Sequence, residues 1–400
     1  MNDLEDELNR RLAAISQQGL WRELRRVDSP QGPRLELGGR VMLNFSSNDY
    51  LGLANEPALK EAAREAVEQY GTGAGASRLI CGSLAPHHEL DETLAAFKDT
   101  EAALSFSSGY SAAMGVICAL LGSDDIIVLD KLVHACIVDA ARLCGAKLRV
   151  FDHNDLNDLE AKLRWAAKIV QSPKPKVQVR ARRVLVVTES VFSMDGDHAP
   201  LREMVELKER YGAWLMVDEA HATGLYGAQR CGLAEELGVS NQIEVQMGTL
   251  GKALGAAGGY ICGSRTLIDY LVNRARTFVF STAPVPAAAA AAAAGVRFVQ
   301  SSAGEERRRK LWQNVTSLLC AIDSQRSTRA SAIIPILMGE ESKAVQAAAT
   351  LRERGIFIPA IRFPTVARGQ ARLRLTLSAS HTPADLAQLV AALKSLDFRL

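Results

Sequence analysis

The chain has 400 residues and a formal net charge of +2, with 48% hydrophobic and 23% charged residues. This length exceeds one ordinary hydrophobic core and is typical of two or three domains. The nearly balanced charge gives no indication of a nucleic-acid or membrane partner. No uncharged apolar stretch in the sequence reaches the roughly 20 residues that a membrane-spanning helix needs.

The seven cysteines are scattered, and no C-x-x-C pair occurs among them. This pattern indicates free thiols in a reducing compartment rather than a disulfide framework or a zinc site. The first fifteen residues mix acidic and basic side chains and lack the apolar run of a signal peptide. We therefore expect a cytoplasmic protein without a metal site.

Residues 1–54 are expected to form a helix followed by an irregular arm, with turn signals at Ser29-Pro30 and Gly38-Gly39. The next helix is expected to begin at Pro57, because proline is tolerated in the first helical turn, and to end at Gly71.

Four short apolar runs then predict strands that are buried on both faces, as in the centre of a parallel sheet. They span residues 126–130, 184–190, 214–221 and 243–248, and helical patterns such as 156–168 separate them. This alternation predicts an α/β fold with a mostly parallel, doubly wound sheet over residues 55–285. An alanine-rich helix and a final helix capped by Thr382 predict a smaller C-terminal α+β domain over residues 286–400.

A basic stretch lies between Glu160 and Glu189, where the sequence has no acidic residue. We interpret it as a solvated loop that leads into a strand. The alternative is a docking surface for an acidic macromolecule. The basic residues are Lys162, Arg164, Lys168, Lys174, Lys176, Arg180, Arg182 and Arg183.

Polar side chains follow the predicted strands at the edge where ligands bind in doubly wound folds. They are Asp130, His134, Glu189, Ser193, Asp218, His221, Thr249 and Lys252. Taken singly, each has a commoner structural role, as a helix cap, a core imidazole or a solvated lysine. Together they predict one ligand-binding site.

Two phosphate-binding motifs are excluded by their context. Residues 248–253 are not a P-loop, because the glycine spacing is short and no Ser or Thr follows the lysine. The glycine-rich run at 71–78 follows a helix rather than a strand, so it is not a dinucleotide fingerprint. A dehydrogenase is therefore disfavoured.

The ordered motifs resemble the α-oxoamine synthases, a family of fold-type-I pyridoxal-phosphate enzymes. They run from LNFSSNDYLGL (43–53) through SSGY (107–110), DKLVHA (130–135), TESVFSMDGD (188–197), VDEAHATG (217–224), GTLGKALG (248–255) and AIRFPTV (360–366) to ARLRLTLSASH (371–381). The resemblance implies a homodimer with pyridoxal 5'-phosphate in an active site at the subunit interface.

The resemblance also implies residue roles. Lys252 would hold the cofactor covalently, Asp218 would pair with its ring nitrogen, His221 and Ser193 would face its phenolic oxygen, and His134 would stack on its ring. We expect Lys252, His134, Asp218 and His221 to be the catalytic groups.

The cofactor phosphate would be bound by Gly109, Tyr110 and Thr249, with Ser281 or Thr282 from the second subunit. The substrate would be bound by Arg362, Asn48, Arg25 and Thr365.

Within the family, FSSNDYLGL and ARLRLTLSASH resemble the branch that condenses L-alanine with a pimeloyl thioester, carried by coenzyme A or an acyl carrier protein, in biotin biosynthesis. Phe363 and Ala367 depart from the branch, which usually has proline at these positions. The alternatives are a glycine-using sister branch and a non-catalytic family subunit. The non-catalytic subunit is disfavoured because Lys252 is present.

Overall fold

The computed structural model describes residues 3–171, 182–322 and 331–396. The chain forms two compact units. Unit 1 comprises Met1–Gly52, Met194–Gly196 and Arg309–Leu400, and unit 2 comprises Leu53–Ser193 and Asp197–Arg308. The boundary expected at residue 286 thus differs from the one found after Arg308, and the amino-terminal residues group with the C-terminal ones.

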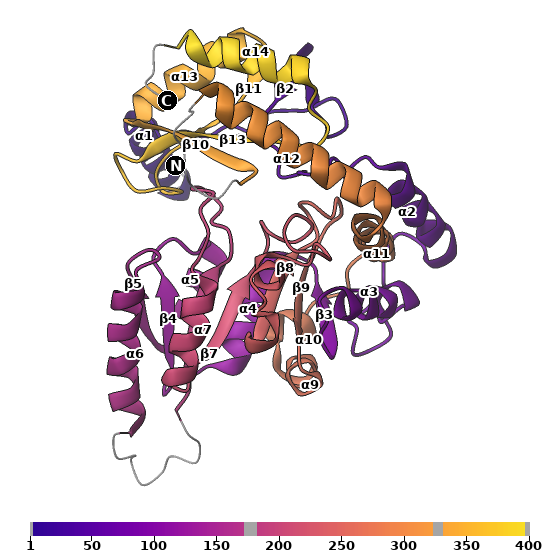
Figure 1. Cartoon of the computed structure of the whole chain (residues 1–400), viewed down its shortest axis with the longest axis vertical. Helices are drawn as coiled ribbons and strands as arrows, with labels where there is room; N and C mark the ends of the chain where they lie inside the picture. The colour runs from indigo at the N-terminus through magenta and orange to yellow at the C-terminus, as the bar shows by residue number, and fades with distance from the viewer. Residues whose placement is uncertain (1–2, 172–181, 323–330, 397–400) are drawn as a thin grey trace. The chain divides into compact units, whose positions relative to one another are not determined.

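Unit 2 contains a seven-stranded sheet (Figure 1). In spatial order its strands are β3 (Ala102–Phe106), β9 (Gly259–Gly263), β8 (Val245–Thr249), β7 (Trp214–Asp218), β6 (Val184–Glu189), β4 (Ile126–Asp130) and β5 (Lys147–Phe151). Only the pairs that involve β9 are antiparallel. The four predicted strands are β4, β6, β7 and β8, and the prediction of a mostly parallel sheet is confirmed.

Helices cover both faces of this sheet, as expected for a doubly wound fold. One face packs against α4 (Gly109–Leu120), α5 (Ala135–Leu143), α9 (Arg265–Arg274) and α10 (Arg276–Val279) in a single apolar cluster. Residues of α6 (Leu156–Gln171) and α7 (Leu201–Arg210) lie outside that cluster, and these two helices contact each other and the strands β4, β5 and β7.

The remaining helices of unit 2 flank the sheet or its connections. α3 (Ala85–Phe97) packs on β3 and also on α11 (Pro286–Gln300), which contacts α2 (Pro57–Tyr70). The short α8 (Leu233–Glu236) and a 3-10 turn, η1 (Ser240–Gln242), lie between β7 and β8 in the chain. The predicted limits of α2 are confirmed, because Pro57 is its first residue and Gly71 caps it with φ +78°.

Unit 1 has an α+β composition, as expected. It contains α1 (Asp3–Gln17) and two three-stranded sheets. One sheet has the order β1 (Arg34–Leu37), β2 (Arg40–Asn44) and β11 (Ile356–Phe357), and the other β10 (Ile333–Gly339), β13 (Ala371–Thr376) and β12 (Ala360–Ile361). Its helices α13 (Glu341–Glu353) and α14 (Pro383–Lys394) follow α12 (Ser302–Ile322), which spans the boundary between the units. Thr382 caps α14, as predicted.

No helix in the described ranges is both long enough and apolar enough to cross a membrane.

Gly255 lies at a close approach in unit 2. Its φ is +69°, and a Cβ added there would lie 2.5 Å from the Cβ of Leu53. Gly212 has a similar φ of +63°, but an added Cβ would find no atom within 4 Å.

We predict that Gly255→Ala lowers stability more than Gly212→Ala. The left-handed backbone costs both variants about 1–2 kcal/mol, while overpacking against Leu53 costs Gly255→Ala about 1–3 kcal/mol more. Thermal midpoints of the two purified apoproteins measure the difference. Equal losses would show that the space around Gly255 can relax.

Candidate active site

The carboxyl ends of the central strands meet at one edge of the sheet in unit 2. Glu189 at the end of β6 is the register partner of Asp218 at the end of β7. Asp218 is in turn the partner of Met247, two residues before Thr249 at the end of β8. The structure therefore brings together the strand-end side chains that the sequence singled out.

Lys252 and His221 contact each other although they follow different strands. The Lys252 Nζ lies 2.7 Å from the Nε2 of His221. Each residue lies three positions beyond its strand, Lys252 after β8 and His221 after β7. Because β7 and β8 are neighbours and parallel, these short connections place the amine beside the imidazole.

Asp218 is a buried carboxylate near these two groups. Its Oδ1 accepts a hydrogen bond from the Ala220 N–H at 2.9 Å. Burial raises the pKa of Asp218, whereas the positive charge of Lys252 acts to lower it. A carboxylate in this position favours a cation next to it.

His134 caps the amino terminus of α5, and its Nδ1 accepts a hydrogen bond from the Cys136 N–H at 3.2 Å. Burial lowers the pKa of His134, although the charge of Asp218 acts to raise it. The imidazole is therefore neutral near pH 7, the form suited to lie against a positively charged ring.

Glu189 belongs to the same cluster, as its place at the end of a predicted strand indicates, although no catalytic or cofactor-binding role was predicted for it. Its Oε1 accepts the backbone N–H of His134 at 2.6 Å, and the backbone N–H of Ser193 also donates to its carboxylate. Burial, with the negative charge of Asp218, raises the pKa of Glu189 to about 8. The sequence signal was present, because Glu189 ends a predicted strand.

The amino terminus of α4 forms a separate group of donors. Ser108 caps the helix through its side chain, which accepts the Ser111 N–H at 3.0 Å. The Gly109 and Tyr110 N–H groups belong to the first helical turn, whose donors have no intrahelical acceptor. A Cβ added to Gly109 would lie 3.9 Å from the Thr249 Oγ1, so this turn and Thr249 are close together.

Ser281 and Thr282 follow α10 and line a small cavity together with Ser107. The Tyr110 hydroxyl donates to the Asp139 carboxylate at 2.6 Å, which fixes the exposed ring next to its helix terminus.

The predicted substrate residues all lie in unit 1. Among them, the Arg362 guanidinium donates to the carbonyl oxygen of Trp21 at 2.5 Å. Asn48 accepts through its Oδ1 from Arg374 at 3.0 Å, which leaves its amide N–H groups directed elsewhere. Thr365 accepts from Arg22 at 3.5 Å.

Arg25 is exposed in the segment after α1. Thr365 contacts Arg22, which is not among the predicted substrate residues.

The residues of unit 2 fit pyridoxal 5'-phosphate. The cluster provides an amine for its aldehyde in Lys252, a buried carboxylate for its ring nitrogen in Asp218, and a neutral imidazole in His134. The first turn of α4 together with Thr249 suits a phosphate, since helix amino termini bind anions. No cluster of three or more metal-binding side chains occurs in the described part of the chain.

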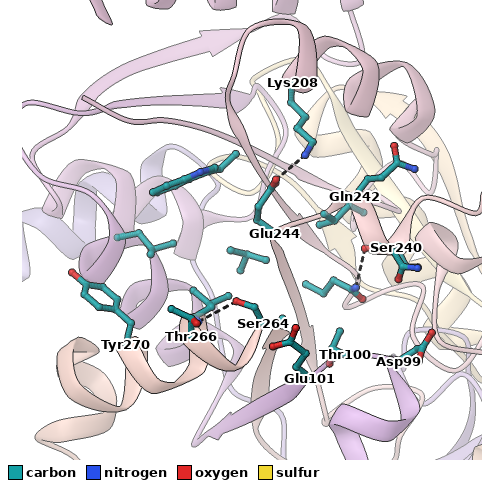
Figure 2. Close-up of a pocket in the computed structure, with 18 of the residues that line it drawn as sticks. Asp99, Thr100, Glu101, Lys208, Ser240, Gln242, Glu244, Ser264, Thr266 and Tyr270 are labelled. Atoms are coloured by element: carbon teal, nitrogen blue, oxygen red, sulfur yellow. Dashed lines mark hydrogen bonds and ion pairs between the residues drawn. The ribbon is translucent and has the colours of Figure 1, made fainter. Parts of the chain in front are cut away.

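A cavity of about 690 Å³ lies elsewhere in unit 2, at the amino-terminal ends of the parallel strands. Figure 2 shows the residues that line it. Its lining includes Trp214 and Val245, the first residues of β7 and β8, and Gly263, the last residue of the antiparallel β9. The ion pair between Lys208 and Glu244 at 2.7 Å lies in its wall. This cavity contains none of the predicted site residues.

Comparisons with known proteins agree with this site. The model of the family "Aminotransferase class I and II" matches residues 40–393. The 8-amino-7-oxononanoate synthase of Anaeromyxobacter dehalogenans is 47% identical over 395 residues, which cover 98% of this chain and 95% of that protein.

Two solved structures are also similar. A serine palmitoyltransferase from S. paucimobilis with bound PLP and myriocin is 28% identical, with a TM-score of 0.88 and coverage of 98% of this chain and 96% of that one. The 8-amino-7-oxononanoate synthase from Francisella tularensis is 26% identical, with a TM-score of 0.73 and coverage of 89% and 96%. The chain therefore belongs to the aminotransferase class I and II family and, within it, to the 8-amino-7-oxononanoate synthase group of pyridoxal-phosphate-dependent acyltransferases.

Proposed function

We propose that the enzyme condenses L-alanine with a pimeloyl thioester and releases 8-amino-7-oxononanoate, carbon dioxide and the free carrier, as a step of biotin biosynthesis. The observation that carries the proposal is the contact between Lys252 and His221 at 2.7 Å. The charge of the same amine acts to lower the pKa of the buried Asp218. The chain is also 47% identical to a relative named for this product.

Lys252 would hold pyridoxal phosphate, Asp218 would face its ring nitrogen, and His134 would lie against the ring. The phosphate would accept hydrogen bonds from the Gly109 and Tyr110 N–H groups and from Thr249. When bound, the cofactor supplies an electron sink for the bonds at the alanine Cα. His221 and Ser193 would donate to its phenolic oxygen.

The side chains of the protein then orient the reacting groups and transfer protons. Asp218 keeps a proton at the ring nitrogen, because a buried carboxylate stabilises a cation beside it. The Lys252 amine takes the Cα proton of alanine and later returns a proton to the product. His221 is within hydrogen-bond distance of that amine and orients it.

Arg362 and Asn48 are proposed to bind the carboxylate of alanine. A guanidinium forms two parallel hydrogen bonds with a carboxylate, which fixes the orientation of the Cα. The amide N–H groups of Asn48 are suited to assist, because Arg374 already occupies its Oδ1. Arg25 and Thr365 are proposed for the acyl substrate, and Arg22 joins them through its contact with Thr365.

The assembly and the acyl carrier are also proposals. We propose a homodimer in which Ser281 or Thr282 of one subunit contacts the cofactor phosphate bound in the other subunit. We also propose that the enzyme is cytoplasmic and has no nucleic-acid or membrane partner. Docking of an acyl carrier protein stays a prediction, since residues 172–181 of the basic stretch lie outside the described residues. In the described part, Lys162 and Arg164 pair with Asp158 and Glu160 on α6, which favours a solvated helix face.

A product assay tests the proposed reaction. We expect turnover with L-alanine and pimeloyl thioester to exceed turnover with glycine and acetyl-coenzyme A by at least about tenfold, since one missing methyl is worth about 1–3 kcal/mol. Mass spectrometry of the products measures both. The reverse preference would assign the chain to the glycine-using branch.

Replacing Lys252 tests the site itself. Lys252→Ala should lose the visible absorbance of the bound cofactor after dialysis and lower turnover by about 10²–10⁴-fold or more, because the amine is both attachment point and proton carrier. Lys131→Ala is the matched control, since Lys131 pairs with Asp152 at the surface. Retained absorbance in Lys252→Ala would place the attachment elsewhere.

Glu189 should make the stability of the apoprotein depend on pH. Its pKa is raised from 4.5 to about 8, so the folded state keeps a proton that the unfolded state has lost across this range. Wild-type stability then falls as the pH rises from about 4.5 to about 8.

Glu189→Gln removes this dependence, and its amide oxygen still accepts the His134 N–H. We therefore expect the thermal midpoint of the variant to rise relative to wild type between pH 5 and pH 8. A difference that stays constant with pH would show that Glu189 is ionised throughout.

A further inference from the structure

An ion pair is buried inside unit 2 next to the proposed site. Lys98, the residue after α3, donates from its Nζ to the Oε2 of Glu219 at 2.5 Å, and the two side chains are 1% and 0% exposed. The same Nζ also donates to the carbonyl oxygen of Cys231 at 2.7 Å. Glu219 follows Asp218 directly in the chain.

The carboxylate of Glu219 is tightly enclosed. Its Oε1 accepts the Ala234 N–H at 2.9 Å. A Cβ added to Gly232 would lie 2.3 Å from its Oε2, so only glycine leaves room for the carboxylate. The backbone N–H of Glu219 donates to the Met247 carbonyl on the neighbouring strand at 2.8 Å.

Glu219 is also the hydrogen-bond centre of the turn that carries His221. Its carbonyl oxygen accepts the N–H groups of Ala222 and Thr223, both at 2.9 Å, and the Thr223 hydroxyl at 3.0 Å. That hydroxyl lies 2.8 Å from the Tyr260 hydroxyl. A shift of Glu219 would therefore move Asp218 on one side and His221 on the other.

We propose that Lys98 is a positioning residue of the active site, which acts through Glu219 to hold the turn from Asp218 to His221. The inference rests on the proposed function, in which these two residues face the cofactor. Buried ion pairs contribute little stability over well-packed apolar residues. A buried ion pair nevertheless fixes the orientation of both side chains, because charge-assisted hydrogen bonds are strong and directional.

Lys98 is charged in this position. Burial acts to lower its pKa, but Glu219, together with Tyr260 and Cys262, acts to raise it, and the pKa of Lys98 is raised. Removal of the lysine would leave the Glu219 carboxylate buried without its cation, and the turn would have to rearrange to solvate it.

Lys98→Met, purified with pyridoxal phosphate, is the test. We expect the cofactor to stay bound, turnover with alanine and pimeloyl thioester to fall by about 10²-fold, and the KM for alanine to change by less than about threefold, since Arg362 and Asn48 are not altered. The visible circular dichroism of the bound cofactor should change, because its ring would lose its fixed orientation.

Lys208→Met is the matched control. Lys208 forms a similar ion pair with Glu244, with side chains 8% and 38% exposed, at the opposite edge of the same sheet (Figure 2). We expect wild-type turnover and circular dichroism. If the two variants behave alike, or if Lys98→Met loses stability without a spectral change, Lys98 is a structural residue and the inference is wrong.

A double variant covers the case in which Lys98→Met does not fold. Lys98→Met with Glu219→Gln removes both buried charges, and the glutamine oxygen can still accept the Ala234 N–H. We expect this protein to fold and to show the same loss of turnover, whereas wild-type turnover would overturn the inference. If wild-type enzyme itself bound no cofactor, the proposed function would fail instead.

Discussion

The carboxylate of Asp218 is buried at the carboxyl ends of parallel strands, and a positive charge near such a group favours its ionised form. In the protein alone, Lys252 supplies such a charge and acts to lower the pKa of Asp218. A protonated pyridine ring would supply another. The ionised form of Asp218 is favoured by the nearby Lys252, and a protonated cofactor ring would favour it in the same way under the proposed function.

The sheet topology brings the remaining groups to this point. Five consecutive strands of the sheet run parallel and end on one side, and His221 and Lys252 are each the third residue after their strand. The helix after β3 begins at Gly109, so its free N–H groups lie beside Thr249. The same arrangement that buries the strands therefore provides the carboxylate, the imidazole, the amine and a site for a phosphate.

The central strands of the sheet and the polar side chains at their ends could be predicted from the sequence. Central parallel strands are apolar on both faces and therefore form continuous apolar runs in the sequence. Two strands that were not predicted, β9 and β5, lack that signal. β9, GYICG, is flanked by glycine on both sides, and β5 is largely exposed at the edge of the sheet.

The environment of each site residue could not be predicted in the same way. The raised pKa of Glu189 depends on Asp218, a partner that is distant in the chain and becomes adjacent only through strand pairing. The contact of Thr365 with Arg22 depends on the path of the segment after α1, where no periodic pattern sets the direction of the side chains.

The covalent attachment of the cofactor can be measured directly. Borohydride reduction of the purified enzyme with bound pyridoxal phosphate, followed by digestion and mass spectrometry, should place the phosphopyridoxyl group on the peptide that contains Lys252. A label on another lysine, or a protein that takes up no label, would contradict the account.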